Sequence, residues 1–393
     1  MKEQIDLSRE YGMVLEGGGA RGAYQIGAWK ALREAGVRIK GIAGTSVGAL
    51  NGALICMDHV EFAEAIWKTM AYSRVMDVDD AMMESLRKMD MKALDLYGLL
   101  NDARRVFTEK GVDITPLKKL IAGCVDEEKI RNSPCEFYVT TYSVTDRKEI
   151  DVNMKEVPPG TMKDILLASA FFPGFKSEKL GGKVYMDGGR VNNVPVDVLA
   201  KRGYRDILAV RIFGIGVEKP LPPEIAGSVS VLQIRPSGNL GGILEFTGKR
   251  ARRNLLMGYF DIKRFLYGLA GRNYYIDMPY TEAYYFDKMM SEMELFRLYA
   301  ESVMDREETE KLSGYRVYTE KIFPAMAKRL KLPSGWDYRD MYAALLESCA
   351  KRMRLDPFRI YTDQELSGEI QRVLGDGNLQ AMLDPQKEKM ENS

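Results

Sequence analysis

The sequence predicts an α/β fold, a three-layer sheet flanked by helices, followed by a helical C-terminal region. Two short apolar runs, residues 11–16 and 37–43, each lead through glycines into a helical pattern, at 23–34 and 47–57. Successive strand–loop–helix units imply parallel strands joined by right-handed crossovers. After Pro236 the strand-like runs stop and helical patterns continue to the end. These observations place the sheet in the first two thirds of the chain.

The remaining strand signals lie between residues 136 and 234. Apolar or alternating runs there predict strands, and short helical patterns separate them. We expect strands at 136–144, 148–153, 183–186, 206–213 and 228–234, and helices at 162–170 and 196–201. Residues 61–130 have a mainly helical, methionine-rich pattern without a clear strand, so we expect a helical insertion there.

The chain is expected to divide near residue 270. Residues 1–270 hold every strand signal, and 271–393 read as a helical accessory region. Near the end of that region Thr362 is followed three residues later by Glu365, which is the pattern of a capping box. It predicts a last helix that Gly375 stops.

Composition excludes several classes of protein. Lysine plus arginine (57) nearly balances aspartate plus glutamate (56), so no net charge steers the chain toward nucleic acid. The four cysteines contain no CxxC pair, which argues against a disulfide framework and a thiolate zinc site and favours a reducing compartment. Residues 1–11 lack the apolar core of a signal peptide, and no apolar run is long enough for a bilayer, so we expect a cytoplasmic protein.

The first chemical motif is Gly44-Thr45-Ser46-Val47-Gly48, which fits the nucleophile elbow G-x-S-x-G between a predicted strand and a predicted helix. Gly44 and Gly48 are needed because the serine lies in a strained turn pressed between strand and helix. The helix beginning at Val47 directs amides and its positive end toward an oxyanion beside Ser46. The alternative is a glycine-rich turn in which Ser46 only caps the helix.

A second motif, Gly17-Gly18-Gly19-Ala20-Arg21-Gly22, lies at the end of the first predicted strand. Parallel strands place it at the same sheet edge as Ser46. Its consecutive glycines allow the backbone to approach a substrate carbonyl and form an oxyanion hole, while Arg21 can hold the loop or bind a phosphate.

The serine needs a base, and histidine is nearly absent from this chain. The one histidine, His59, is thirteen residues beyond Ser46 at the far end of the predicted helix, roughly 20 Å away along a continuous helix. A Ser-His-Asp triad is therefore not expected, and His59 reads as a helix-terminal residue favoured by the helix dipole. Asp187, which ends a short strand before Gly188 and Gly189, is the candidate base, although an Asp-Gly pair is more often a turn.

Together, the glycine loop, the elbow and Asp187-Gly188-Gly189 resemble the patatin-like phospholipase family, in particular its bacterial members. Residues 168–173, Ala-Ser-Ala-Phe-Phe-Pro, are also similar to that family. The resemblance covers approximately residues 11–265. It implies a patatin-like three-layer sheet in a catalytic domain within residues 1–270, and a lipid ester as substrate. It further implies Ser46 as nucleophile, Asp187 as base, Gly17, Gly18 and Gly19 as oxyanion donors, and no metal or other cofactor.

Two other functions compete with this interpretation. Gly17, Gly19 and Gly22 also fit a dinucleotide-binding G-x-G-x-x-G, but residues 43–46 stand where a Rossmann site has its ribose-binding acid. A non-catalytic lipid-binding protein with the same fold is the other alternative, and reaction of Ser46 with an organophosphonate discriminates it from an enzyme.

Residues 249–267 predict a basic amphipathic helix that could contact a membrane surface. One face holds Leu255, Tyr259, Ile262 and Leu266, and the other holds Arg250, Arg253, Asp261 and Arg264. The alternative is that the apolar face packs on the catalytic domain. Met82, Met83, Met89 and Met91, with Leu86, Leu94 and Leu96, form either an adaptable acyl-chain surface or ordinary core.

Overall fold

The structure is a computed structural model, and it describes residues 5–88, 112–171, 175, 179–291, 316 and 318–373. It divides into two compact units, residues 4–263 and residues 264–393 together with 1–3. The division between the two units falls within the residues of helix α11 (Gly248–Tyr267). None of the helices in the described ranges has the length and apolar composition needed to cross a bilayer.

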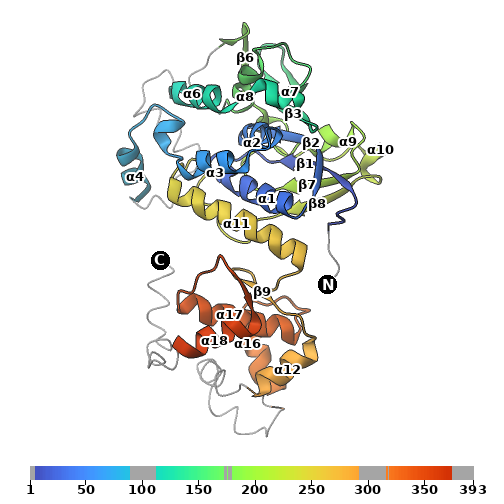
Figure 1. Cartoon of the computed structure of the whole chain (residues 1–393), viewed down its shortest axis with the longest axis vertical. Helices are drawn as coiled ribbons and strands as arrows, with labels where there is room; N and C mark the ends of the chain where they lie inside the picture. Colours follow the sequence, from blue (N-terminus) through green and yellow to red (C-terminus); the bar gives the residue numbers. More distant parts are fainter. Residues whose placement is uncertain are drawn as a thin grey trace. The chain divides into compact units, whose positions relative to one another are not determined.

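A mixed eight-stranded sheet forms the centre of the larger unit (Figure 1). Its strands are β1 (Glu10–Leu15), β2 (Arg38–Thr45), β3 (Glu136–Ser143), β4 (Lys148–Asn153), β5 (Lys179–Leu180), β6 (Lys183–Asp187), β7 (Asp206–Val210) and β8 (Ser230–Ile234). The order is β5-β6-β3-β2-β1-β7-β8, with β4 also paired to β3. The five strands β3, β2, β1, β7 and β8 are parallel to one another, as predicted for β1 and β2, whereas β4 and β6 pair with β3 in the antiparallel direction.

Helices cover both faces of this sheet. One face carries α1 (Ala23–Glu34), α2 (Val47–Cys56), α3 (Val60–Lys68) and α8 (Met162–Ser169), and the other carries α9 (Val196–Ala200). Val14 and Ala43 pack in one cluster with Val198 of α9. Neighbouring Ile42 points the opposite way and approaches α2 at Gly52. Side chains that alternate between two buried faces confirm the predicted three-layer α/β fold.

The segment that follows α2 consists, in its described parts, of helices joined by short connections, with one isolated bridge at Val112. It contains α3, η2 (Tyr72–Arg74), α4 (Asp80–Lys88), α6 (Thr115–Cys124) and α7 (Glu127–Asn132). Met82 is exposed on α4, whereas Met89, Met91, Leu94 and Leu96 lie outside the described residues. The choice between an acyl-chain surface and ordinary core, left open by the sequence, therefore stays untested for the residues after α4.

The strand predicted at 206–213 is shorter than expected. β7 ends at Val210, and Phe213, which the prediction included, has a φ of 50°, outside the range of an extended strand. A short helix, α10 (Pro223–Ala226), which the sequence did not indicate, follows before β8. The other differences at the ends of elements are of one to three residues.

The apolar stripe of α11 is used inside the larger unit. Leu255 and Ile262 are buried. The backbones of α1 and α11 are in contact because each helix has a glycine at the crossing. A Cβ added to Gly27 of α1 would lie 1.9 Å from the carbonyl oxygen of Leu255. A Cβ added to Gly258 of α11 would lie 2.0 Å from the carbonyl oxygen of Tyr24. These contacts agree with the packing alternative, so this stripe is not available to insert into a membrane.

The smaller unit is a separate, mainly helical body. It contains β9 (Tyr275–Asp277), β10 (Ile360–Thr362), α12 (Glu282–Ser291), the π-helical η4 (Tyr318–Ile322), α16 (Phe323–Arg329), α17 (Tyr338–Arg352) and α18 (Asp363–Val373). Buried Tyr285 and Tyr342 stack in its core with ring centroids 5.5 Å apart. The capping box is confirmed, since Thr362 and Glu365 exchange side-chain-to-amide hydrogen bonds of 2.9 and 3.1 Å. Gly375 lies outside the described residues.

Candidate active site

Ser46 occupies a strained turn between β2 and α2. Its φ is 55° and its ψ is −126°, a conformation that few residues other than glycine adopt. The turn is tight on both sides: a Cβ on Gly44 would lie 2.5 Å from the backbone of Gly48, and one on Gly48 would lie 2.1 Å from the carbonyl oxygen of Leu15. The geometry of a nucleophile elbow predicted from the sequence is present, and the hydroxyl stands at the N-terminus of α2.

The register of the sheet brings Asp187 to this turn. β4 occupies one edge of β3, so β2 and β6 share the other edge. β2 pairs along this edge as far as Thr45 opposite Thr140, and the antiparallel β6 takes the next position with Asp187 opposite Thr141. Since the two strands run toward each other and meet end to end, the residue after β2 and the last residue of β6 are neighbours.

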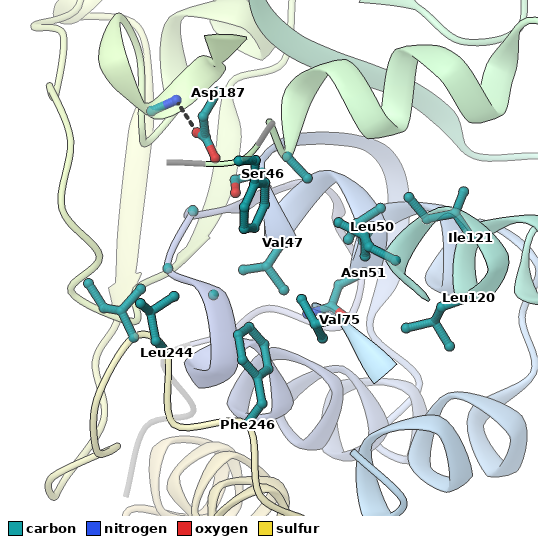
Figure 2. Close-up of a pocket in the computed structure, with 18 of the residues that line it drawn as sticks. Ser46, Val47, Leu50, Asn51, Val75, Leu120, Ile121, Asp187, Leu244 and Phe246 are labelled. Carbon is teal, nitrogen blue, oxygen red and sulfur yellow. Dashed lines mark hydrogen bonds between the residues drawn. The ribbon is translucent and has the colours of Figure 1, made fainter. Parts of the chain in front are cut away.

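Asp187 is a buried carboxylate, and the part of the chain that the structure describes places no cationic partner on it. Its side chain is 7% exposed, it accepts a hydrogen bond of 2.8 Å from the amide of Gly189, and its carboxylate faces the Ser46 hydroxyl (Figure 2). Burial raises the pKa of Asp187 to about 6, although the hydrogen bonds from Ser46 and Gly189 act in the opposite direction. No charged side chain of the described residues contributes to this shift in pKa.

The glycine loop is held rigidly beside Ser46. Arg21 donates from Nε to the carbonyl of Gly241 at 2.8 Å, and from its terminal nitrogen to Ile212 at 3.3 Å and to Phe213. Arg21 therefore fixes the loop with its hydrogen bonds. Gly22, whose Cβ would lie 2.5 Å from Val47, lets the loop pack directly on α2.

The amides of the glycine loop differ in what they can bind. The amide of Gly17 donates to the carbonyl of Asn193 at 3.2 Å, so it is engaged within the protein. The amides of Gly18 and Gly19 have no acceptor within the part of the chain that the structure describes. Both residues border the same cavity as Ser46. The proposed oxyanion donors are thus reduced from three glycines to Gly18 and Gly19.

Two residues that the sequence did not single out support the site. Ser169 accepts a hydrogen bond of 2.9 Å from the amide of Ser46 and donates one of 2.7 Å to the carbonyl of Thr140. Asn193 donates from its side chain to the carbonyl of Gly17 at 3.1 Å. Ser169 belongs to the stretch 168–173, of which 172 and 173 lie outside the described residues. A pair of asparagines shortly after Asp187 was the available signal for Asn193.

A cavity of about 430 Å³ opens from the dyad into the helical layer. Figure 2 shows Ser46 and Asp187 at one end and Leu120 and Ile121 of α6 at the other. Its walls are mostly apolar and include Val47, Leu50, Leu54, Ile66, Trp67, Val75, Leu117, Leu244 and Phe246. A cavity of this size and composition suits one long apolar group with its polar end at Ser46.

His59 has a structural role at another helix. The sequence placed it at the far end of the helix beginning at Val47, but α2 ends at Cys56 and His59 instead precedes α3. Its Nδ1 accepts a hydrogen bond of 3.1 Å from the amide of Phe62, so it is the N-cap of α3. The expected stabilisation by a helix C-terminus was wrong, and the side chain is exposed and absent from the cavity wall.

Comparison with known proteins identifies the part of the chain that holds this site. Residues 13–200 match the family model for patatin-like phospholipases. The chain contains a patatin-like phospholipase domain. The match includes the glycine loop, the elbow and Asp187, so the patatin-like domain carries each of the motifs on which the resemblance was based.

Relatives of the patatin-like domain are found in animals and fungi. Neuropathy target esterase sws of Drosophila melanogaster is 28% identical over 205 residues, 51% of this chain and 13% of that protein. Patatin-like phospholipase domain-containing protein 7 of Rattus norvegicus is 28% identical over 203 residues, again 51% and 13%. Lysophospholipase nte1 of Aspergillus terreus is 60% identical over 50 residues, 13% of this chain and 3% of that one. The chain thus spans about an eighth of the first two relatives.

Among solved structures, VipD from Legionella pneumophila is similar, with a TM-score of 0.40 and 12% identity over 65% of this chain and 66% of that one. The type III effector ExoU has a TM-score of 0.31 and 15% identity over 86% and 74%.

Proposed function

We propose that this chain is a serine hydrolase of carboxylic esters of lipids, with Ser46 as nucleophile and Asp187 as general base. One observation carries the proposal: a strained, cavity-facing serine hydroxyl lies beside a buried carboxylate whose pKa no charged side chain of the described residues lowers. A pKa of about 6 keeps Asp187 ionised at neutral pH, yet leaves it basic enough to accept a proton.

In the first half-reaction, Oγ of Ser46 attacks the ester carbonyl carbon as Asp187 takes the hydroxyl proton. The carbonyl electron pair moves onto oxygen, where the amides of Gly18 and Gly19 and the positive end of α2 stabilise the negative charge. Collapse of the tetrahedral intermediate breaks the bond to the alcohol, which leaves with the proton from Asp187. The acyl group remains on Ser46.

In the second half-reaction, Asp187 takes a proton from water and the hydroxide attacks the acyl-enzyme. A second tetrahedral intermediate forms at the same position and uses the same donors. Its collapse releases the fatty acid and returns the proton to Ser46. The sequence of steps uses only the chain's own groups and water.

The cavity supports a lipid as the acyl donor. Leu50, Leu54 and Trp67 belong to its apolar wall, which can bury an acyl chain while the ester stays at Ser46. We also propose that residues 4–263 contain the complete hydrolytic machinery, because every residue that borders the cavity belongs to this unit. The smaller unit then has an accessory role.

Labelling with a fluorescent alkyl fluorophosphonate tests the proposal directly. Wild-type protein should be labelled with one probe per chain at Ser46, and Ser46→Ala should lose both the label and turnover of a nitrophenyl ester. Ser228→Ala, which removes an exposed hydroxyl outside the cavity, is the matched control and should behave as wild type. A wild-type protein that binds lipid but takes no label would be a non-catalytic binder.

A further inference from the structure

An exposed apolar segment follows β7 at the mouth of the cavity. Three large apolar side chains lie within five residues of this segment, and about half of each is exposed: Phe213 (50%), Ile215 (59%) and Val217 (50%). Ile215 and Val217 also border the cavity that holds Ser46. We call Phe213, Ile215 and Val217 the apolar rim. Apolar side chains gathered beside a binding cavity are typical of an interaction surface.

Buried polar groups hold the start of this rim in place. The carboxylate of Glu16 accepts hydrogen bonds from the amides of Ile212 and Phe213 at 2.7 and 3.0 Å. The same carboxylate pairs with Arg211 at 3.0 Å, and Arg21 holds the carbonyls of Ile212 and Phe213. The main chain at Phe213 is therefore fixed in a left-handed conformation that bulky residues rarely adopt.

The other end of the rim is tied to the site itself. The amide of Val217 donates to the carbonyl of Gly189 at 2.9 Å, and the amide of Asn193 donates to the carbonyl of Val217 at 2.6 Å. Both ends are thus anchored, and the side chains of the rim are displayed to solvent from a defined backbone. Collapse of this segment onto the protein would break hydrogen bonds at both ends.

The charge beside the rim indicates what it contacts. Arg190, which directly follows Gly189, is exposed and is the one cationic side chain among the described residues that border the cavity. It has no hydrogen-bond or ion-pair partner in the described part of the chain. An apolar rim with one cation at its side matches the interface of a bilayer, where acyl chains lie beneath phosphates.

We propose that the apolar rim inserts into a lipid surface and that Arg190 faces the lipid phosphates, so that the mouth of the cavity opens at the interface. A lipid can then pass from the surface along Ile215 and Val217 to Ser46 without crossing water. The inference deepens the proposed function and rests on it for the fate of the lipid, but the docking step needs no chemistry.

Vesicle flotation of the full chain tests docking separately from hydrolysis. The parent carries Ser46→Ala so that the vesicles, equal parts of phosphatidylcholine and phosphatidylglycerol, stay intact. Phe213→Asn removes the apolar side chain and suits a positive φ, because asparagine tolerates that conformation. We expect its binding to weaken about tenfold. Arg190→Gln should weaken binding to these vesicles and leave binding to pure phosphatidylcholine unchanged.

Leu256→Gln is the matched control. Leu256 is 43% exposed on α11, away from the cavity wall, so its replacement should leave vesicle binding as in the parent. Equal binding by the parent and Phe213→Asn would overturn the proposal. Vesicle binding that is lost in Arg250→Glu with Arg253→Glu, yet kept in Phe213→Asn, would also overturn the proposal and assign the contact to the basic face of α11.

Turnover measurements keep docking and chemistry distinguishable. With Ser46 present, Phe213→Asn should hydrolyse a soluble nitrophenyl butyrate at the wild-type rate and lose activity only on vesicles. Loss of soluble-ester turnover in this variant would show a structural role for Phe213 and sink the docking proposal. Vesicle binding without fluorophosphonate labelling of wild type would instead preserve docking and contradict the proposed hydrolysis.

Discussion

Two buried carboxylates at the ends of strands in the same sheet have opposite surroundings. Glu16 follows β1 and is 2% exposed, with the guanidinium of Arg211 at 3.0 Å and two backbone amides as donors. Asp187 ends β6 and is 7% exposed, with one backbone amide as donor and the hydroxyl of Ser46 facing it. The two carboxylates are buried to a similar extent, but only Glu16 has a cation, Arg211, beside it among the described residues.

This difference separates a structural acid from a base. The carboxylate of Glu16 is paired with Arg211 and accepts from two amides, so it can organise the backbone around it. Burial raises the pKa of Asp187 to about 6, and no charged side chain of the described residues opposes this shift. Glu16 positions the segment at Phe213, whereas Asp187 is available for proton transfer.

The strongest test of the comparison is Asp187→Asn. The amide keeps the shape of the side chain but cannot accept the proton of Ser46, so kcat should fall by roughly 10⁴-fold.

The same variant should be more stable than wild type at neutral pH. Because the folded pKa of about 6 lies above the ordinary 3.8, ionisation of Asp187 lowers stability as pH rises through this window. At pH 7.5 the variant should be more stable by about 1–3 kcal/mol, as measured by urea unfolding. An inactive variant that is also less stable would contradict this account of Asp187.

The pH dependence of hydrolysis follows from the same carboxylate. Only the ionised form of Asp187 can take the proton, so kcat/KM for a soluble ester should be level above pH 7 and decrease about tenfold per pH unit well below 6. The profile is measured between pH 4.5 and 8 at roughly constant ionic strength, with circular dichroism at each pH to verify folding. A rate that stays constant down to pH 4.5 would exclude a base with a pKa of about 6.

Glu16→Gln tests the structural acid. The amide oxygen can still accept from the main chain, but the guanidinium of Arg211 loses this anion and keeps only the more exposed Glu218, so the free energy of unfolding should fall by about 2 kcal/mol. Arg9, which pairs with Asp206 at an exposed site, gives the matched control: Asp206→Asn should change stability by less than about 1 kcal/mol. If Glu16→Gln and Asp206→Asn lowered the free energy of unfolding by similar amounts, the ion pair between Glu16 and Arg211 would not organise this edge of the sheet.

Ser169→Ala should have a moderate effect on the rate. Without its hydroxyl the amide of Ser46 loses an acceptor and the elbow loses a support, so kcat should fall about tenfold while KM changes little. Slower labelling by the fluorophosphonate, with an unchanged pH profile, would identify Ser169 as a positioning residue. A change in KM alone would argue against this role.

The smallest effect is expected for His59→Ala. The variant should hydrolyse a soluble ester within about threefold of wild type, and loss of the N-cap of α3 should lower stability by about 1 kcal/mol. A variant as inactive as Ser46→Ala would overturn the dyad.

Local patterns predicted much of the catalytic unit. The glycine spacing around Ser46, the strand before it and the helix after it are all encoded within a few residues, and the structure has them at 38–45 and 47–56. The capping box at Thr362 was equally local. Such features depend on neighbouring residues alone, so a single sequence suffices to find them.

What the sequence did not reveal depends on pairings between distant segments. Nothing in residues 183–187 shows that β6 continues the edge of β3 where β2 ends. The use of the Gly17 amide by Asn193, and the burial of Leu255 against α1, are likewise non-local. An amphipathic pattern shows that a face is apolar, but it does not show what covers that face.

The end-to-end meeting of β2 and β6 also sets when the protein becomes reactive. A chain emerging from the ribosome presents the elbow early, but its serine has no base until the segment ending at Asp187 has been synthesised and has added to β3. Under the proposed mechanism, translation products that stop before residue 187 would lack the base. Reactivity toward esters should therefore appear only after Asp187 has been synthesised and has joined β3.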